Sequence, residues 1–526
     1  MMRSAADVIL ALRLKGVRIW SDKGRLRYKA SKGVVTPADI QKLSALKVEI
    51  LAIVQQSSRE PTELRLVPRA IAEKVPLTFT QQSWWNLMGL EKRHSTRSVF
   101  TAVRLLGPLN VPALGQSFSE LVRRHQTLRT RIVTVDGVLQ QVVCDEPSDA
   151  LELIETSCTL EGESEAEAER LTLEVVTNAI DVSIGPLFAA RLIKLRDNDH
   201  VLVVAMDHLI SDAASMGILL QDVWTLYGQY REGVPVGLPK LPVQFADYAV
   251  WQQKSHSSWT EKHGAWWANH LAGGRHVRLF ADGKVTQAVG PKPASLPIRF
   301  GKTLSAGLRD LSRKERTTLA MTVLCAYGAL AFCWSNTTNL VVPFVTMGRT
   351  YAELERVIGF FGCPLFLRLQ LHDDDSFLDL LRRIGEEYPT ACEHYDSGNV
   401  GAQIPRPEFT RNVTFNWYPA EFCVHPAAFT AFVGGAAAPG LSKHLRLQPF
   451  MVDKPLHAVL GSDVEWDGEG GLQLTDSEEG ITGVIAYRTE RTAAGQVSRF
   501  GRNLALFAER LLKDPHGRVK ACQLCD

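Results

Sequence analysis

A short polar cluster in the middle of the chain combines residue types that can move protons. Residues 207–213 read DHLISDA. Histidine exchanges protons near neutral pH, so His208 can serve as an acid or a base. Asp212, four residues on, can fix the conformation of the loop. A single histidine at the end of a strand is often structural, and these residues alone leave a catalytic and a structural interpretation open.

The flanking segments place this cluster at the end of a buried strand. Residues 201–208 (VLVVAMDH) form an apolar run typical of a strand, and residues 216–228 (MGILLQDVWTLYG) have apolar positions at helical spacing. Loops at the ends of such elements often carry the chemistry of a fold. From residue 76 onward strands and helices alternate, which predicts an α/β (α+β) fold. Two halves of similar size meet near residues 240–275.

The N-terminal segment predicts a small separate domain. Residues 4–15 have helical apolar spacing, and the alternating runs VRIW (17–20) and RLRYK (25–29) predict a β-hairpin. The pair Thr36-Pro37 begins a second helix, because threonine can cap it and proline suits its first turn. The predicted organisation is a helix–hairpin–helix domain, a linker and two lobes, with limits 1–56, 57–75, 76–255 and 256–526.

Composition excludes several classes of protein. Of the 526 residues, 45% are hydrophobic and 22% charged, values typical of a globular protein in water. No apolar run reaches the roughly 18 residues of a membrane span, and the N-terminus lacks the features of a signal peptide. We therefore predict a cytoplasmic protein. The nine cysteines argue against a disulfide framework, and the lone Cys522–Cys525 pair is not expected to bind metal.

Charge is unevenly distributed along the chain. The net charge is +2, yet residues 1–55 hold 11 Lys or Arg against 4 Asp or Glu. This segment therefore carries +7 and the remainder −5. A basic small domain on a slightly acidic body suggests an acidic partner for the N-terminus. There are two alternatives: a basic face without a partner, and nucleic-acid binding in which Trp20 and Tyr28 stack on bases. Trp20 fits the core of the small domain better than it fits base stacking.

The segment LRLKGVRIWSDKGRLRYKASKGVVTPADIQKLSALKVEIL (12–51) resembles the β-hairpin docking domains at the N-termini of assembly-line subunits. The resemblance implies that the hairpin binds a short, often acidic C-terminal tail of an upstream synthase subunit. An exposed strand edge offers unpaired backbone groups, and basic side chains attract acidic ones. The residues expected to form this docking surface are Arg18, Trp20, Arg25, Arg27, Lys29 and Lys32.

The polar cluster and its surroundings resemble the condensation domains of nonribosomal peptide synthetases. The segment MDHLISDAASMGILLQDVW resembles their H-H-x-x-x-D-G active-site motif. Further matching segments follow in the family's order: LTFTQQSWW (77–85), RRHQTLRTR (123–131), DVSIGPLFAARL (181–192), QFADYAVWQQ (244–253), VPFVTMGRTYAELERVIGFFGCPLFLRL (342–369), ACEHYD (391–396), VTFNWY (413–418) and a closing segment at 483–512. The resemblance implies two chloramphenicol-acetyltransferase-like lobes that form a V with a central tunnel.

The resemblance also assigns roles to individual residues. His208 matches the catalytic histidine of the family, Asp212 matches a structural aspartate, and Arg349 is its expected ion-pair partner. Two positions depart from the motif: Asp207 replaces the first histidine and Ala213 replaces the glycine. An aspartate next to His208 would favour the imidazolium form, and Ala213 would add a methyl group to a tight turn. Both changes put the reaction rate in doubt rather than the fold.

We therefore predict an acyltransferase that joins a carrier-bound acyl chain to an amine or alcohol. The sequence contains no adenylation motif, no carrier-type G-G-x-S serine and no phosphate-binding loop, so a free-standing enzyme supplied by another polypeptide is expected. It needs no bound cofactor or metal, because the phosphopantetheine arm comes with the partner's acyl or peptidyl carrier protein. The acceptor is a small molecule or carrier-bound, and nucleic acid and membrane are not expected partners. The alternatives are a catalytically silent recruitment module and an epimerase.

Overall fold

The computed structural model describes part of the chain in detail. The described residues are 18–22, 25–29, 39–40, 43, 47, 65–70, 74–87, 94–95, 99–145, 150–156, 161–275, 277, 279, 293–395, 413–418, 445–450, 470–477, 480–489 and 492–524. Two compact units can be distinguished, Met1–Val67 and Pro68–Asp526. The division falls between the residue limits predicted for the linker.

The first unit contains a β-hairpin. Strand β1 (Arg18–Asp22) pairs antiparallel with β2 (Arg25–Lys29). Residues 39, 40, 43 and 47 are helical, inside the predicted second helix, and Leu43 is buried with 5% of its surface exposed. The predicted first helix, residues 4–15, lies outside the described residues.

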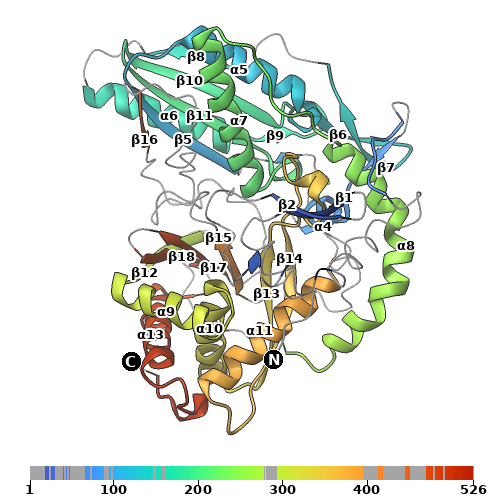
Figure 1. Ribbon diagram of the computed structural model, residues 1–526. Coiled ribbons are helices and arrows are strands. Elements are labelled where there is room, and N and C mark those ends of the chain that lie inside the picture. The colour runs from blue at the N-terminus through green and yellow to red at the C-terminus, as the bar shows by residue number, and fades with distance from the viewer. Residues whose placement is uncertain are drawn as a thin grey trace. The chain divides into compact units, whose positions relative to one another are not determined.

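The second unit contains a five-stranded sheet that has helices on both faces (Figure 1). Its central strand β11 (Asp199–Met206) is buried at every position. Helices α5 (Val111–Arg124) and α7 (Ala213–Glu232) pack on one face, and α6 (Glu161–Thr177) packs on the other. Because both faces are covered, the middle of β11 is a continuous apolar run. The other strands are β5 (Val99–Leu106), β8 (Glu152–Glu155), β10 (Phe188–Arg196) and β16 (Arg446–Pro449).

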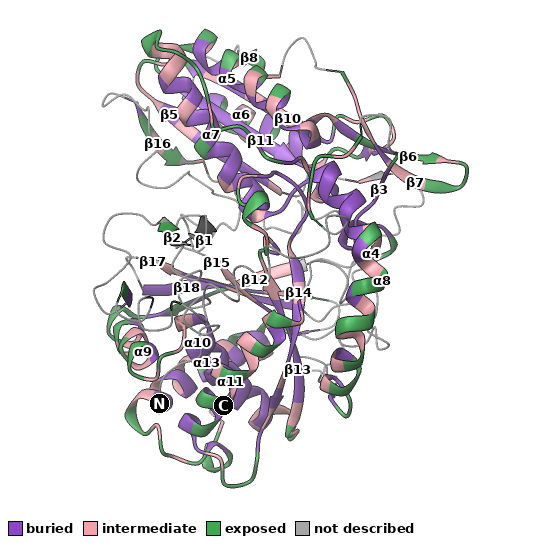
Figure 2. Cartoon of the chain, turned by 45° about the vertical axis from the view of Figure 1, so that its right-hand side comes forward, coloured by how far each residue is buried: buried purple, intermediate pink, exposed green. Residues whose placement is uncertain are grey.

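The second unit also contains a six-stranded sheet, whose helices lie on one face (Figures 1 and 2). Helix α10 (Leu319–Ser335) is buried from Ala320 through Phe332, which explains its almost uniformly apolar sequence. The strand order is β12 (Pro293–Phe300), β18 (Gly480–Arg488), β17 (Gly470–Ser477), β15 (Thr414–Tyr418), β13 (Asn339–Thr346) and β14 (Cys363–Gln370). The other helices are α9 (Lys302–Lys314), α11 (Phe377–Glu393) and α13 (Ala494–Lys513).

Two elements link the halves of the second unit. Helix α8 (Phe245–His270) is continuous through the predicted lobe limit at residues 255 and 256. Strand β16 lies far along the chain but pairs antiparallel with β5, with Arg446 opposite Leu106. The chain after α8 therefore completes a sheet built mainly by the chain before it. For convenience we call the two parts the N-lobe and the C-lobe.

The remaining elements are short. Helix α4 (Phe79–Leu87) precedes β5, and a three-stranded sheet and a two-stranded ladder complete the N-lobe. Their strands are β3 (Val75–Pro76), β7 (Val138–Val143) and β6 (Thr130–Val135), and β4 (His94–Ser95) with β9 (Ile180–Asp181). Short 3₁₀ turns are η3 (Gln126–Arg129), η4 (His208–Ile210), η5 (Ala352–Leu354) and η9 (Val519–Ala521).

No single described helix is long and apolar enough to cross a membrane; α9 and α10 pass such a test only as a pair, bent by 107°.

Candidate active site

The turn that carries His208 is held together by Asp207. Strand β11 ends at Met206, and the Asp207 carboxylate accepts a hydrogen bond of 2.7 Å from the backbone N–H of Leu209. The Ser211 hydroxyl donates to the Asp207 carbonyl oxygen at 2.8 Å. The side chain of Asp207 is buried. The residue that replaces the family's first histidine therefore caps a short 3₁₀ turn and fixes the backbone at His208.

His208 is half-buried, and its imidazole lies against two aromatic rings. Its ring centroid is 4.7 Å from that of Trp84 in α4 and 4.3 Å from that of Phe360 in the C-lobe. Nδ1 is buried and has no hydrogen-bond partner in the described part of the chain. Groups from both lobes thus surround this histidine.

Burial lowers the pKa of His208 below its ordinary value. The backbone of His208 and Ser211 and the charge of Asp212 act in the opposite direction without outweighing burial. The expectation that Asp207 would favour the imidazolium form is therefore wrong. Asp207 Oδ1 accepts a hydrogen bond from the Leu209 N–H. A neutral imidazole with a free lone pair can accept a proton.

Asp212 and Arg349 form an ion pair between the lobes. The two guanidinium nitrogens lie 3.0 and 3.1 Å from the two carboxylate oxygens, and each side chain exposes 7% of its surface. Asp212 also caps α7 by accepting from the Ser215 N–H at 2.8 Å. Burial alone would raise the pKa of Asp212, but the charge and hydrogen bonds of Arg349, together with Ser215, hold it below its usual value.

Ala213 is the first residue of α7, directly after the Asp212 cap. Its backbone is therefore helical, a conformation that alanine adopts more readily than glycine. The expected strain of an added methyl group in a tight turn does not arise at this position.

The residues between β13 and β14, numbers 347–362, form what we call the bridging segment. They belong to the C-lobe but bind the N-lobe at several points. Asp212 accepts hydrogen bonds from the N–H groups of Phe361 at 3.0 Å and Gly362 at 3.1 Å. Gly359 packs so closely that an added Cβ would lie 2.1 Å from the Phe245 ring, so only glycine fits.

A second ion pair binds the bridging segment to the middle of α7. Arg356 contacts the carboxylate of Asp222, which is fully buried. His125 Nε2 lies 3.3 Å and Arg124 Nε 3.6 Å from the same carboxylate. Burial also lowers the pKa of His125. Arg124 and His125 of the segment RRHQTLRTR thus have a structural role beside a buried carboxylate.

Five of the six predicted docking residues lie on the hairpin of the first unit. By backbone register Arg18 is opposite Lys29, Trp20 is opposite Arg27, and Arg25 is opposite Asp22. These alternate positions share one face of the hairpin. Arg27 is exposed. Lys32 lies outside the described residues.

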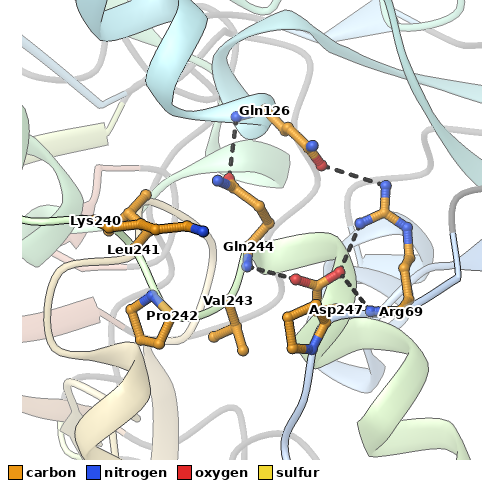
Figure 3. Close-up of a pocket in the computed structure, with 9 residues that line it drawn as sticks. Arg69, Gln126, Lys240, Leu241, Pro242, Val243, Gln244 and Asp247 are labelled. Carbon is orange, nitrogen blue, oxygen red and sulfur yellow. Dashed lines mark hydrogen bonds and ion pairs between the residues drawn. The ribbon is translucent and has the colours of Figure 1, made fainter.

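A separate cavity of about 580 Å³ opens beside the start of α8 (Figure 3). It is lined by Pro68, Arg69, Gln126, Lys240, Leu241, Pro242, Val243, Gln244 and Asp247. Asp247 accepts a hydrogen bond of 2.7 Å from Arg69 and another of 2.7 Å from the Gln244 N–H, which completes a capping box. These groups bind one another and include none of the residues around His208. The aspartate of QFADYAVWQQ thus has a structural role that sequence reasoning did not identify.

Comparison with known proteins decides the family. The condensation domain model matches residues 71–403, and the model of the TubC N-terminal docking domain matches residues 6–56. The chain belongs to the condensation domain family. It is 33% identical over 358 residues to one of the linear gramicidin synthase proteins of Brevibacillus parabrevis, a match that covers 67% of this chain and 7% of that protein. The chain thus spans only a small part of the curated relative.

Solved structures share the fold of this condensation domain. The X-domain from teicoplanin biosynthesis matches with a TM-score of 0.71 at 22% identity, covering 88% of this chain and all of that one. A structure described as the molecular basis for condensation domain-mediated chain release from the enacyloxin polyketide synthase matches with a TM-score of 0.61 at 19% identity, covering 97% and 96%. The predicted chloramphenicol-acetyltransferase-like fold and the N-terminal docking domain are confirmed.

The structure shows neighbours of His208 that sequence reasoning missed. Trp84 and Phe360 belong to quoted family segments, yet neither was singled out. The only signal in the sequence is an aromatic doublet in each segment, WW at 84–85 and FF at 360–361. No group of His, Cys, Asp or Glu in the described ranges could hold a metal ion.

Proposed function

We propose that this condensation domain is a free-standing acyltransferase. It takes an acyl chain from the phosphopantetheine thioester of a carrier protein on another subunit and passes it to an amine or alcohol. The product is an amide or an ester, and the reaction can serve chain release. The observation that carries this proposal is the half-buried imidazole of His208, placed where the Asp212 loop of the N-lobe meets the bridging segment of the C-lobe.

In the proposed reaction His208 is the catalytic residue. The nucleophile loses a proton to the imidazole as its nitrogen or oxygen bonds to the thioester carbonyl carbon. The tetrahedral intermediate then collapses, the C–S bond breaks, and the thiolate leaving group takes up a proton. The lowered pKa of His208 keeps the ring unprotonated near neutral pH, which this role requires. An alcohol depends on the base more than a neutral amine does, because its own pKa is far higher.

Asp212 and Arg349 support this reaction without touching the substrate. They close the junction between the lobes beside His208, and Asp212 holds the start of α7. The phosphopantetheine arm enters as part of the substrate on its carrier protein, so the enzyme itself carries no cofactor. These roles agree with membership of the condensation domain family.

The docking domain would bring the donor to the enzyme. We propose that the face of the hairpin that bears Arg18, Trp20, Arg25, Arg27 and Lys29, together with Lys32, binds a short acidic C-terminal tail of an upstream synthase subunit. The match to the TubC N-terminal docking domain supports a partner subunit. The acceptor is a small molecule or a second carrier-bound group. A cytoplasmic location, without nucleic-acid or membrane partners, remains our prediction.

A silent recruitment module is the alternative function. In teicoplanin biosynthesis an X-domain forms a complex with OxyB, and the X-domain in that structure matches this chain with a TM-score of 0.70. The retained His208 argues for activity in this chain.

The proposal is tested by intact-mass spectrometry of acyl transfer. The full-length protein is mixed with carrier proteins loaded with candidate acyl groups and with candidate amines or alcohols. Loss of the acyl mass from the carrier, together with gain of the matching product, is expected only when the enzyme is present. Unchanged carriers across a broad panel of donors and acceptors would favour the recruitment module.

A further inference from the structure

The rings around His208 form a corner rather than a sandwich. The Trp84 and Phe360 centroids are 5.9 Å apart and the two rings meet edge to face at 89°. The imidazole centroid is 4.7 Å from one and 4.3 Å from the other, with tilts of 45° and 46°. The imidazole therefore packs into the angle between the two rings, and the aromatic contacts cover adjacent sides of it.

Residues close to Trp84 and Phe360 in the chain form hydrogen bonds to the His208 turn and to the start of α7. Gln81, one helical turn before Trp84, donates from Nε2 to the carbonyl oxygen of Leu209 at 2.7 Å. Gln81 is fully buried, so this bond is shielded from water. Helix α4 is thus fixed to the residue that follows His208.

Phe360 is held on both sides along the chain. The N–H of Gly359 donates to the Ser215 hydroxyl at 3.0 Å, and the N–H of Phe361 donates to Asp212 at 3.0 Å. Both acceptors belong to the N-lobe and lie within the first turn of α7 or at its cap. The backbone of Phe360 is therefore set by the same loop that carries His208.

We propose that Trp84 and Phe360 are positioning residues that orient the His208 imidazole and exclude water from two of its sides. The inference rests on the proposed function, in which His208 handles the proton. One aromatic ring comes from each lobe, so correct placement of the imidazole requires the two lobes to be joined. Because Nδ1 is buried, we assign the lone pair that meets the nucleophile to Nε2.

Of the charged groups nearby, Asp212 acts on the imidazole, and it raises the pKa of His208 without outweighing burial. Helix α4 has no charged residue (FTQQSWWNL), and residues 357–362 (VIGFFG) have none. On its own loop, Asp207 accepts the Leu209 N–H and Asp212 is paired with Arg349. Desolvation is accordingly the main cause of the lowered pKa of His208, and the two aromatic rings supply part of it.

The test uses chemical modification of the full-length protein and needs no substrate. Diethyl pyrocarbonate reacts with neutral imidazole, so the pH dependence of His208 carbethoxylation, followed by peptide mass spectrometry, gives both a midpoint and a plateau rate. In Trp84→Leu and Phe360→Leu we expect a faster plateau and a midpoint raised towards the ordinary histidine value. Trp84→Phe keeps a ring and should stay close to wild type.

A second readout links this placement to the reaction. The two leucine variants should lose about 10- to 100-fold in kcat with little change in KM, because a misplaced base slows chemistry more than binding. Trp85→Phe is a core substitution at the neighbouring position. It should leave the modification midpoint, kcat and KM close to those of the wild type.

Several results would overturn the inference. Unchanged midpoints in both leucine variants, or equal shifts in Trp85→Phe, would show that Trp84 and Phe360 do not control the pKa and accessibility of the His208 imidazole. A shifted midpoint with wild-type kcat would remove its role in the reaction. If the wild-type protein transfers no acyl group at all, the proposed function fails, and the modification data still decide whether Trp84 and Phe360 hold the imidazole.

Discussion

Near His208 the ion pair between Asp212 and Arg349 is buried, whereas the hairpin Arg18–Lys29 is a two-stranded element on which Arg27 is exposed. Asp212 and Arg349 expose 7% of their side chains, so water screens their interaction poorly. Exposed charges are screened strongly and contribute little to folding stability. Charge near His208 therefore fixes structure, while charge on the hairpin is suited to guiding a partner. Substitutions in the two regions should differ in kind.

The largest effect should come from His208→Ala. We expect acyl transfer to fall by about 10²–10⁴-fold, because one imidazole supplies that much proton-transfer catalysis. The ring packs against Trp84 and Phe360, so its removal should cost some stability, but the buried Asp212–Arg349 ion pair remains and the variant should still fold. Transfer rates and thermal melting of the same preparation check both parts. Wild-type transfer by a folded variant would refute the catalytic assignment.

Asp212→Ala should instead act mainly on stability. Removing one member of a buried ion pair leaves the other charge unpaired and costs about 3–5 kcal/mol of unfolding free energy. Arg349 would lose both carboxylate contacts, and the N–H groups of Phe361 and Gly362 would lose their acceptor. Denaturant unfolding measures the change.

Asp212→Asn separates the ion pair from the helix cap, since asparagine still caps α7. A useful comparison is Arg356→Met in the second ion pair. The Arg356 side chain is 38% exposed, and Asp222 keeps Arg124 and His125 nearby, so a smaller loss is expected. Equal stability of Asp212→Ala and wild type would contradict the structural role of Asp212.

The sequence predicted the family, the fold and the hairpin, because each depends on patterns along the chain. Element limits near the site were less accurate: the strand predicted to include His208 ends at Met206, and the helix predicted from residue 216 begins at Ala213. In both cases an aspartate side chain binds a backbone N–H and sets the limit, which apolar spacing does not reveal. Capping therefore decided these two limits.

The aromatic neighbours of His208 show what could not be predicted. Trp84 and Phe360 are separated by about half of the chain, and their approach depends on how α4 and the bridging segment fold onto the Asp212 loop. Likewise, β16 belongs to the C-lobe part of the sequence, yet it pairs with β5 in the N-lobe sheet. Such contacts arise from tertiary packing, for which a single sequence gives no spacing rule.

On the hairpin side of the comparison, deletion of residues 1–56 should weaken transfer from the cognate carrier subunit without changing the chemistry. Docking raises the local concentration of the donor, so its loss should reduce transfer by about 10- to 100-fold at low enzyme concentration. The second compact unit begins at Pro68, beyond the deleted segment. Small pantetheine thioesters bypass docking and should react equally with both forms. Equal use of the full-length carrier subunit would refute the docking role.

The smallest effect is expected from reversing charge at two hairpin positions, Arg25→Glu with Arg27→Glu. Both residues lie on β2 at alternate positions, so their backbone pairing with β1 can persist. The reversal should weaken binding of an acidic tail and leave unfolding of the second unit unchanged, in contrast to Asp212→Ala. Because exposed charges are screened over about 8–10 Å at 0.1–0.15 M salt, wild-type affinity should also fall as salt rises. The double variant should show a flatter salt dependence in calorimetric titrations with a synthetic tail peptide. Salt-independent binding by the wild type would mean that apolar or backbone contacts, rather than these charges, hold the tail.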